Sequence, residues 1–262
     1  MKLIARHSIK FGKIKNMKIK KLKVVKPKKK NKILYLGGKD VERLYLRNVR
    51  FKMADGRDAF VTKTDIPGAD MGDVIARHKG RYALLALFSR PGYNLLDFPC
   101  GSGYAADFLK EFGVKYNGKE VNRATIEYAN RIYGGKDTLF DVGDLRSPKL
   151  GLNLYDVIGC IEGLEHIDKK YQSPLISSFY KALKPSGTLI VSTPETESGV
   201  SGRSVLSPYH KWELNKNDFL ALLYKHFGSQ NVELVTFRAT MSTGILTTCF
   251  FGICHKKHEN KK

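Results

Sequence analysis

The sequence is poor in cysteine and has no long apolar run. Among its 262 residues are four cysteines, and none of them stands in a C-x-x-C pair. We therefore expect neither a zinc site built on cysteine nor a disulfide framework, and we expect a reducing compartment, the cytoplasm by default. No stretch reaches the about 20 apolar residues that a transmembrane helix needs. A transmembrane segment is therefore not expected. A signal peptide is not expected either, because no apolar signal-peptide core follows the basic start.

Acidic residues are absent from the first 32 positions, where basic residues are concentrated. Residues 1–32 carry thirteen Lys and one Arg, so they supply +14 of the formal net charge of +21. Such a block of like charges is typical of a flexible arm. Its usual partners are nucleic-acid phosphates, RNA included, or an anionic membrane surface. A lysine-rich overall composition, a mitochondrial leader and a nuclear address at residues 26–30 stay open as other interpretations.

Beyond the arm, apolar runs and helical stretches alternate. Residues 33–72 indicate an extension with short strands around a turn at 55–57, and residues 73–262 form the main domain. Strands separated by helices pair in parallel through right-handed crossovers. The last two apolar runs are joined by a short polar segment, which predicts an antiparallel hairpin. In the main domain we expect helices at 73–88, 104–113, 122–133, 169–184 and 215–227, and strands at 94–98, 115–120, 137–141, 155–160, 187–193, 231–239 and 245–254.

A short glycine loop follows the first of these strands. Asp97 ends the strand, where it could bond a ligand amine or ribose, and Gly101 and Gly103 allow a sharp turn that a ligand can approach closely. The dinucleotide fingerprint G-x-G-x-x-G would need glycines where Pro99 and Ala106 stand, so this loop fits NAD poorly. The loop instead resembles motif I, D-x-G/A-C-G-x-G, of the class I S-adenosylmethionine (SAM)-dependent methyltransferases.

This resemblance extends over residues 73–254 and implies both a fold and a cofactor. The segment Leu183–Pro194 is similar to the family's L-K-P-G-G-x-L-I-V-S-T-P strand. The implied fold class is α/β, with a Rossmann-like, seven-stranded, mostly parallel sheet, an antiparallel last strand and helices on both faces. The implied cofactor is SAM, held around Asp97, Pro99, Gly101 and Gly103.

Three further segments resemble the family's cofactor-binding positions. Glu120 stands where the family has the acid of G-x-D, which binds the ribose hydroxyls. Asp144 and Leu145 occupy the G-D segment, which implies that they bond the adenine. Arg81 lies in a segment similar to H-x-x-R-Y, with the register altered by one residue, and its guanidinium suits the SAM carboxylate.

The fourth strand of the domain is followed by a segment that resembles the family's E-x-L-E-H-[IV]. The spacing i, i+3, i+4 would place Glu162, Glu165 and His166 on one face of a helical turn beside the methyl donor. Two carboxylates and an imidazole predict a divalent site for Mg²⁺ or Mn²⁺. His210 is the expected fourth ligand, because E-x-x-E-H and a later His hold a metal in the small-RNA 3′-end 2′-O-methyltransferases and the quinone-biosynthesis O-methyltransferases. Without a metal, the two His would pack or orient the substrate.

Signatures of base methylation are missing from the chain. No N-P-P-Y or D-P-P-Y follows the fourth strand, which argues against adenine N-methylation, and no Pro-Cys nucleophile stands there for cytosine C5 chemistry. The expected function is therefore SAM-dependent O-methylation, with an RNA 2′-hydroxyl as acceptor and His166 and Glu162 as catalytic candidates. A small-molecule acceptor (a sugar, quinone or metabolite) is the alternative, and a non-catalytic RNA- or ribosome-bound subunit is a third.

Overall fold

A computed structural model describes residues 34–35, 51–52, 58–59, 71–205, 207–240 and 246–257. The basic arm at 1–32 and most of the extension therefore lie outside the described residues. None of the helices in the described residues combines the length and the apolar character that a membrane crossing requires. The short strands expected within residues 33–64 are present as β1 (Leu34–Tyr35), β2 (Phe51–Lys52) and β3 (Asp58–Ala59).

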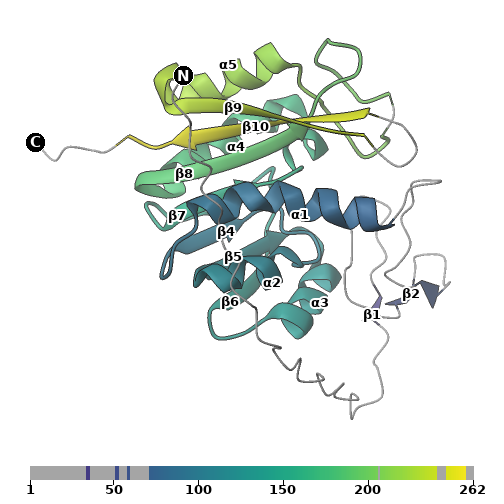
Figure 1. Cartoon of the computed structure of the whole chain (residues 1–262), viewed down its shortest axis with the longest axis vertical. Helices are drawn as coiled ribbons and strands as arrows, with labels where there is room; N and C mark the ends of the chain where they lie inside the picture. Colours follow the sequence, from purple (N-terminus) through teal and green to yellow (C-terminus); the bar gives the residue numbers. More distant parts are fainter. Residues whose placement is uncertain are drawn as a thin grey trace, which may run out of the picture. The chain divides into compact units, whose positions relative to one another are not determined.

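The main domain is built on one seven-stranded sheet with the order β6-β5-β4-β7-β8-β10-β9 (Figure 1). The first five of these strands pair in parallel, and β10 pairs antiparallel with both β8 and β9. The predicted fold class is thereby confirmed. The strands are β4 (Asn94–Asp97), β5 (Lys115–Glu120), β6 (Thr138–Val142), β7 (Tyr155–Cys160), β8 (Leu183–Pro194), β9 (Val232–Thr240) and β10 (Leu246–His255).

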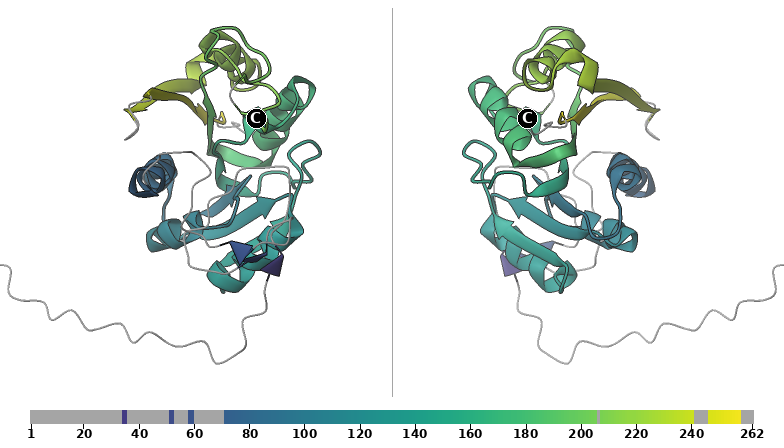
Figure 2. Two further views of the ribbon diagram at one scale, coloured as in Figure 1. Left: turned by 90° about the vertical axis from the view of Figure 1, so that its right-hand side faces the viewer. Right: turned by 90° about the vertical axis from the view of Figure 1, so that its left-hand side faces the viewer.

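Helices cover both faces of this sheet, with α1 on one side and α4 on the other (Figure 2). Side chains of α1, α2 and α3 contribute to one apolar cluster, and those of α4 and α5 to a second. Phe179 of α4 and Phe219 of α5 are fully buried in the second cluster. The helical segments are α1 (Met71–Phe88), α2 (Ala105–Leu109), η1 (Lys110–Phe112), α3 (Arg123–Tyr133), η2 (Leu164–His166), α4 (Lys169–Ala182), α5 (Lys216–Phe227) and η3 (Ser229–Asn231).

Local sequence signals explain where several helices begin and end. Asn122 and Asn215 cap α3 and α5, because each side-chain oxygen accepts a backbone N–H of the first turn, at 3.0 and 2.9 Å. The helix expected at 104–113 is instead two pieces, α2 and η1, and it stops at Gly113, whose φ of 68° is left-handed. The helix expected to reach residue 184 stops at Ala182, since β8 already begins at Leu183.

Candidate functional site

The carboxyl ends of the parallel strands meet at one edge of the sheet. Asp97, Glu120 and Cys160 end β4, β5 and β7, which are neighbours in the sheet. Ligands of open α/β sheets bind outside this edge. Most of the site residues predicted from the sequence follow these strands, so the fold brings them to one side of the molecule.

The glycine loop after β4 has the backbone that its sequence demands. Gly101 and Gly103 both have left-handed φ, 51° and 83°. A Cβ on Gly103 would lie 2.7 Å from the Phe140 ring and 2.9 Å from the Cβ of Ala129, so only glycine fits there. A Cβ on Gly101 would meet no heavy atom of the described residues within 4 Å. The loop is therefore packed on its inner side at Gly103 and open at Gly101.

Neighbouring strands hold this loop in place. The N–H of Phe98 donates to the carbonyl of Gly159 at 2.9 Å, and the N–H of Cys100 donates to that of Lys119 at 2.8 Å. Pro99 lies between them and packs against Gly163, where the space for a Cβ is already filled by the proline ring. The structure thus places Pro99 against the loop that follows β7.

Asp97, which the sequence predicts at the cofactor site, lies in the interior of the protein. Its side chain is fully buried and accepts hydrogen bonds from the hydroxyls of Tyr116, at 2.5 Å, and Tyr82, at 3.4 Å. Burial raises the pKa of Asp97 to about 7, although both hydroxyls favour the ionised form. The two tyrosines satisfy its oxygens from inside the protein, so Asp97 stabilises the strand end.

The predicted ribose and adenine residues lie at the ends of β5 and β6. Glu120 is buried, and its Oε1 accepts the N–H of Asn122 at 3.1 Å. The carboxylate of Asp144 accepts from Nε and Nη2 of Arg146, along one edge of the guanidinium, at 2.7 to 3.0 Å. The hydrogen bonds from Arg146 lower the pKa of Asp144. Leu145 points into the second apolar cluster, so its side chain belongs to the core.

Arg81 and Glu162 form a partly buried ion pair between α1 and the loop after β7. Nη2 of Arg81 lies 3.0 Å from Oε2 of Glu162 and 3.5 Å from Sγ of Cys249. Burial disfavours the charge of Arg81, but the carboxylate of Glu162 together with Cys249 and Tyr104 outweighs this, so the pKa of the guanidinium is raised. The other oxygen of Glu162 accepts the hydroxyl of Ser192 at 2.7 Å.

Glu162 therefore does not join the predicted metal ligands, and this part of the prediction was wrong. The prediction assumed a helical turn that begins at Glu162. In the structure Glu162 has a left-handed φ of 49°, and η2 begins only at Leu164. With this change of backbone direction, the Glu162 carboxylate contacts Arg81 and Ser192.

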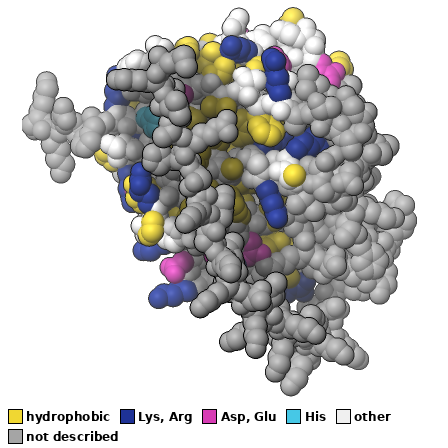
Figure 3. Space-filling view, viewed as in Figure 1, with side chains coloured by type: hydrophobic (Ala, Val, Ile, Leu, Met, Phe, Trp, Pro, Cys, Tyr) yellow, Lys and Arg dark blue, Asp and Glu magenta, His cyan; other side chains and the backbone are white. Residues whose placement is uncertain are grey.

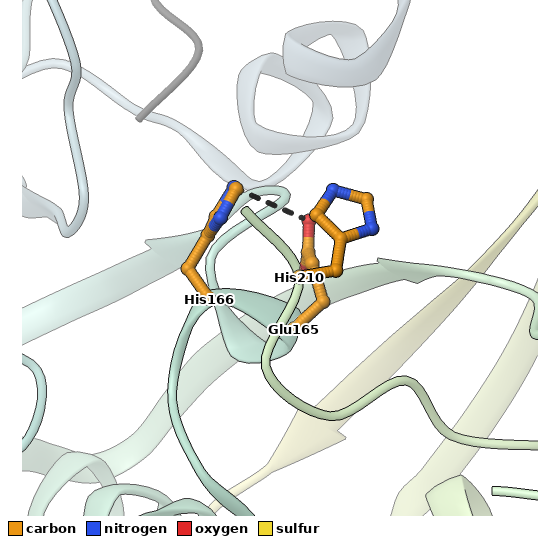
Figure 4. A group of neighbouring side chains, drawn as sticks. All are labelled: Glu165, His166 and His210. Atoms are coloured by element: carbon orange, nitrogen blue, oxygen red, sulfur yellow. Dashed lines mark ion pairs between the residues drawn. The ribbon is translucent and has the colours of Figure 1, made fainter. Parts of the chain in front are cut away.

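Three of the four predicted metal ligands do converge. Ligand atoms of Glu165, His166 and His210 all lie within 4.8 Å of one another. Figure 4 shows these side chains turned toward one another, with Nε2 of His166 3.9 Å from Oε1 of Glu165. Backbone N–H groups of Lys211 and Trp212 donate to the carbonyl of Glu165, at 2.7 and 3.2 Å, which ties the loop of His210 to η2.

Both imidazoles are fixed in one tautomer by acceptors on Nδ1. Nδ1 of His166 lies 3.2 Å from the carbonyl of Tyr209, and Nδ1 of His210 lies 2.6 Å from Oε1 of Glu213. These acceptors need a donor, so Nδ1 carries the proton and Nε2 keeps its lone pair. Burial lowers the pKa of His166 to about 4, and His210 adds to this effect. Both rings are thus arranged to accept a proton or a cation at Nε2.

Glu165 is the buried acid of this cluster. Its side chain is 1% exposed, and Oε2 has no hydrogen-bond partner within the described part of the chain. Burial raises the pKa of Glu165 well above its usual range, and the charge of Glu162 adds to the effect. The hydroxyl of Thr193 opposes this rise in pKa but does not offset it. A buried carboxylate with so few donors is costly to ionise, so a cation beside Glu165 would stabilise its charge.

Two supporting residues were missed in the sequence. The sequence places Ser192 in a structural strand and gives no sign that its hydroxyl donates to Glu162. Glu213 stands three residues after His210, and this spacing was the signal that could have identified it as the acceptor for the imidazole.

The fold and the open glycine loop define a Rossmann-like methyltransferase, and comparison with known proteins identifies the family. A model described as a methyltransferase domain matches residues 45–233, well over half of the chain, so this chain belongs to that family. The family predicted from motif I, the class I SAM-dependent methyltransferases, is thereby confirmed. The match begins within the segment that we assigned to the extension.

The similar proteins are all named as methyltransferases, and the names that point to a substrate point to different ones. A probable SAM-dependent methyltransferase of Mycolicibacterium smegmatis is 30% identical over 160 residues, which are 60% of this chain and 60% of that protein. A ubiquinone biosynthesis O-methyltransferase of Rickettsia typhi is 31% identical over 106 residues, which are 38% of this chain and 40% of that protein.

A solved structure shows the same fold with a cofactor product bound. Phosphoethanolamine N-methyltransferase 2 of Haemonchus contortus, in complex with phosphomonomethylethanolamine and S-adenosylhomocysteine, has a TM-score of 0.55 at 16% identity. The match covers 69% of this chain and 53% of that one. This chain therefore spans less than two thirds of the length of each of these three proteins.

Proposed function

We propose that this methyltransferase transfers the methyl group to oxygen, on an acceptor with two adjacent hydroxyls, and that this acceptor is the 3′ end of an RNA. The observation that carries the proposal is the cluster of Glu165, His166 and His210, whose ligand atoms lie within 4.8 Å of one another. The cluster lies in the segments that follow β7 and precede α5, on the side of the sheet where the cofactor loop ends β4.

The residues of this cluster fit a divalent cation. Oε2 of Glu165 is buried without a partner among the described residues, and both His present an Nε2 lone pair. Oxygen and nitrogen ligands without sulfur suit Mg²⁺ or Mn²⁺. When bound, such an ion would hold the acceptor diol and lower the pKa of the hydroxyl that is methylated.

The chain's own side chains would position the acceptor. With a cation bound, Glu165 would ionise and supply a carboxylate ligand from the interior, where its side chain is 1% exposed. Tyr209 and Glu213 prevent the two imidazoles from rotating, so Nε2 of each ring faces the cluster at a fixed place. A rigid, buried site of this kind contributes mainly by orientation, which is the main requirement of in-line methyl transfer.

The cofactor would lie along the strand ends next to this cluster. The open side of Gly101 admits the ligand, and the buried acid Glu120 accepts from the ribose hydroxyls. Arg81 would bind the carboxylate of SAM, because its Nε–H is buried without a partner in the described residues. Asp144 and the backbone of Leu145 would bond the adenine, which requires Asp144 to share its carboxylate with Arg146.

The charge distribution favours RNA over a small acceptor. The first 32 residues supply +14 of the net charge of +21. On the described part of the face drawn in Figure 3, Lys and Arg side chains stand at separate points and form no continuous basic patch. We therefore assign the contact with the RNA backbone to residues 1–32. A quinone or other small diol is the second candidate, supported by the ubiquinone biosynthesis relative.

Labelled SAM tests this proposal with two RNAs that differ at one atom. One ends in a 2′,3′-diol and the other in a 2′-deoxyribose, and each is incubated with the protein and Mn²⁺. We expect label only in the RNA with the diol. Equal labelling of both RNAs would contradict the diol, and label in a catechol but in neither RNA would favour the small-molecule acceptor.

A further inference from the structure

A buried polar network joins four elements at the carboxyl edge of the sheet. Arg81 comes from α1, Glu162 from the loop after β7, Ser192 from β8 and Cys249 from β10. The side chains of Arg81 and Glu162 are 14% and 19% exposed, and Cys249 and Ser192 are buried. Charges in such a position must be paired and hydrogen-bonded. Each side chain of the network therefore limits the positions that its neighbour can adopt.

Ser192 holds Glu162 through two hydrogen bonds. Its hydroxyl donates to Oε1 of Glu162 at 2.7 Å, and it accepts the backbone N–H of the same residue at 2.9 Å. Glu162 has the left-handed φ of 49°, which a residue with a side chain seldom adopts. The pair of bonds stabilises this conformation and at the same time fixes the direction of the carboxylate.

Glu162 in turn leaves one donor of Arg81 unpaired among the described residues. Its Oε2 contacts only Nη2 of the guanidinium, at 3.0 Å, and Cys249 contacts the same nitrogen. Nε of Arg81 is buried and has no partner within the described residues. An Arg with a paired Nη2 and a buried, unpaired Nε–H is held in place and still offers a donor to an anion.

We propose that Glu162, clamped by Ser192, is a positioning residue that aims Arg81 at the carboxylate of the cofactor. This inference rests on the proposed role of Arg81. Glu162 acts through Arg81 and contacts neither the acceptor nor the metal, so it differs in kind from Glu165 although it stands only three residues before it. The amino-acid end of SAM then depends on two side chains, Glu162 and Ser192, that do not contact it.

Two ligands distinguish positioning from a general structural role. S-adenosylhomocysteine carries the amino-acid end, and methylthioadenosine has the same adenosine without it. We expect Glu162→Gln to weaken S-adenosylhomocysteine about tenfold, the effect of a misplaced hydrogen bond to a charged group, and to leave methylthioadenosine unchanged in calorimetric titrations. Ser192→Ala should likewise weaken S-adenosylhomocysteine and leave methylthioadenosine unchanged. This variant tests the inference if Glu162→Gln does not fold.

Glu120→Gln is the matched control. Glu120 is proposed to bind the ribose, which both ligands contain, so this variant should weaken both by the same factor. Equal weakening of both ligands in Glu162→Gln and in Ser192→Ala would show a structural role and overturn the inference, as would an unchanged or higher affinity for S-adenosylhomocysteine. Wild-type protein that binds neither ligand would contradict the cofactor site itself, which is a different and recognisable failure.

Discussion

Nδ1 of His210 lies 2.6 Å from Oε1 of Glu213, three residues further along the chain. Glu213 is buried, and among the described residues His210 is the one basic side chain within ion-pair distance of it. A carboxylate behind an imidazole fixes the tautomer and makes Nε2 a better ligand. Glu213 therefore fixes the orientation of His210, the predicted metal ligand.

Glu213→Gln should weaken the binding of Mn²⁺ by about 10- to 100-fold, the usual cost of removing such an outer partner. The amide can still accept from Nδ1 but no longer raises the basicity of the ring. Mn²⁺ affinity measured by titration calorimetry checks this, with Glu195→Gln, a nearby acid outside the cluster, as the control. An affinity equal to that of wild type would show that Glu213 serves the fold alone.

Asp97→Asn should change how stability depends on pH. The folded protein keeps the proton on Asp97 up to about pH 7, whereas the unfolded chain releases it near pH 4. The folded state then binds more protons between these values, so this group stabilises the fold fully below pH 4 and the contribution is lost as the pH rises to 7. Between pH 5 and pH 8 wild type should lose roughly 2 to 3 kcal/mol that the variant does not lose.

Urea denaturation of both proteins at the two pH values measures this difference. The unfolding free energy of Asp97→Asn should rise relative to that of wild type as the pH increases. A difference between the two proteins that is the same at pH 5 and pH 8 would mean that Asp97 has an ordinary pKa, and that the enclosure by Tyr82 and Tyr116 is not maintained in solution.

Two glycines of the cofactor loop should respond differently to substitution. Gly101→Arg places its side chain in open space, at a strain of roughly 1–2 kcal/mol for the left-handed backbone, so it should fold and lose SAM binding. Gly103→Ala collides with Phe140 and Ala129, which adds about 1–3 kcal/mol of overpacking. Thermal unfolding and SAM titration check both. If Gly101→Arg folds and binds SAM normally, the cofactor does not bind at this loop.

Much of the fold could be predicted from the sequence, because strands and helices alternate with clear apolar periods and the loops carry glycine or a capping Asn. The direction of single side chains could not. Glu162, Glu165 and His166 fit one helical face on paper, but the left-handed backbone at Glu162 separates the first from the other two. Asp97 ends a strand as predicted, and only the packing of Tyr82 and Tyr116, from other elements, shows that it faces inward.

Removal of residues 1–32 should lower the affinity for RNA and flatten its dependence on salt. Each phosphate contact contributes about −0.7 to −0.9 to the slope of log affinity against log salt, and the arm holds fourteen cationic side chains. Fluorescence anisotropy with a labelled RNA at several salt concentrations measures the slope. The same slope for the full-length and the shortened protein would show that residues 1–32 do not contact the RNA.

The most direct test of this account is whether a metal ion binds at Glu165, His166 and His210. Titration of Mn²⁺ followed by electron paramagnetic resonance should give one bound ion per chain in the wild-type protein. Glu165→Gln, His166→Ala and His210→Ala should each lose it, whereas Glu162→Gln should keep it, because its carboxylate is turned to Arg81 and Ser192. Wild-type protein that binds no Mn²⁺, or an ion that Glu162→Gln loses and His210→Ala retains, would contradict the account.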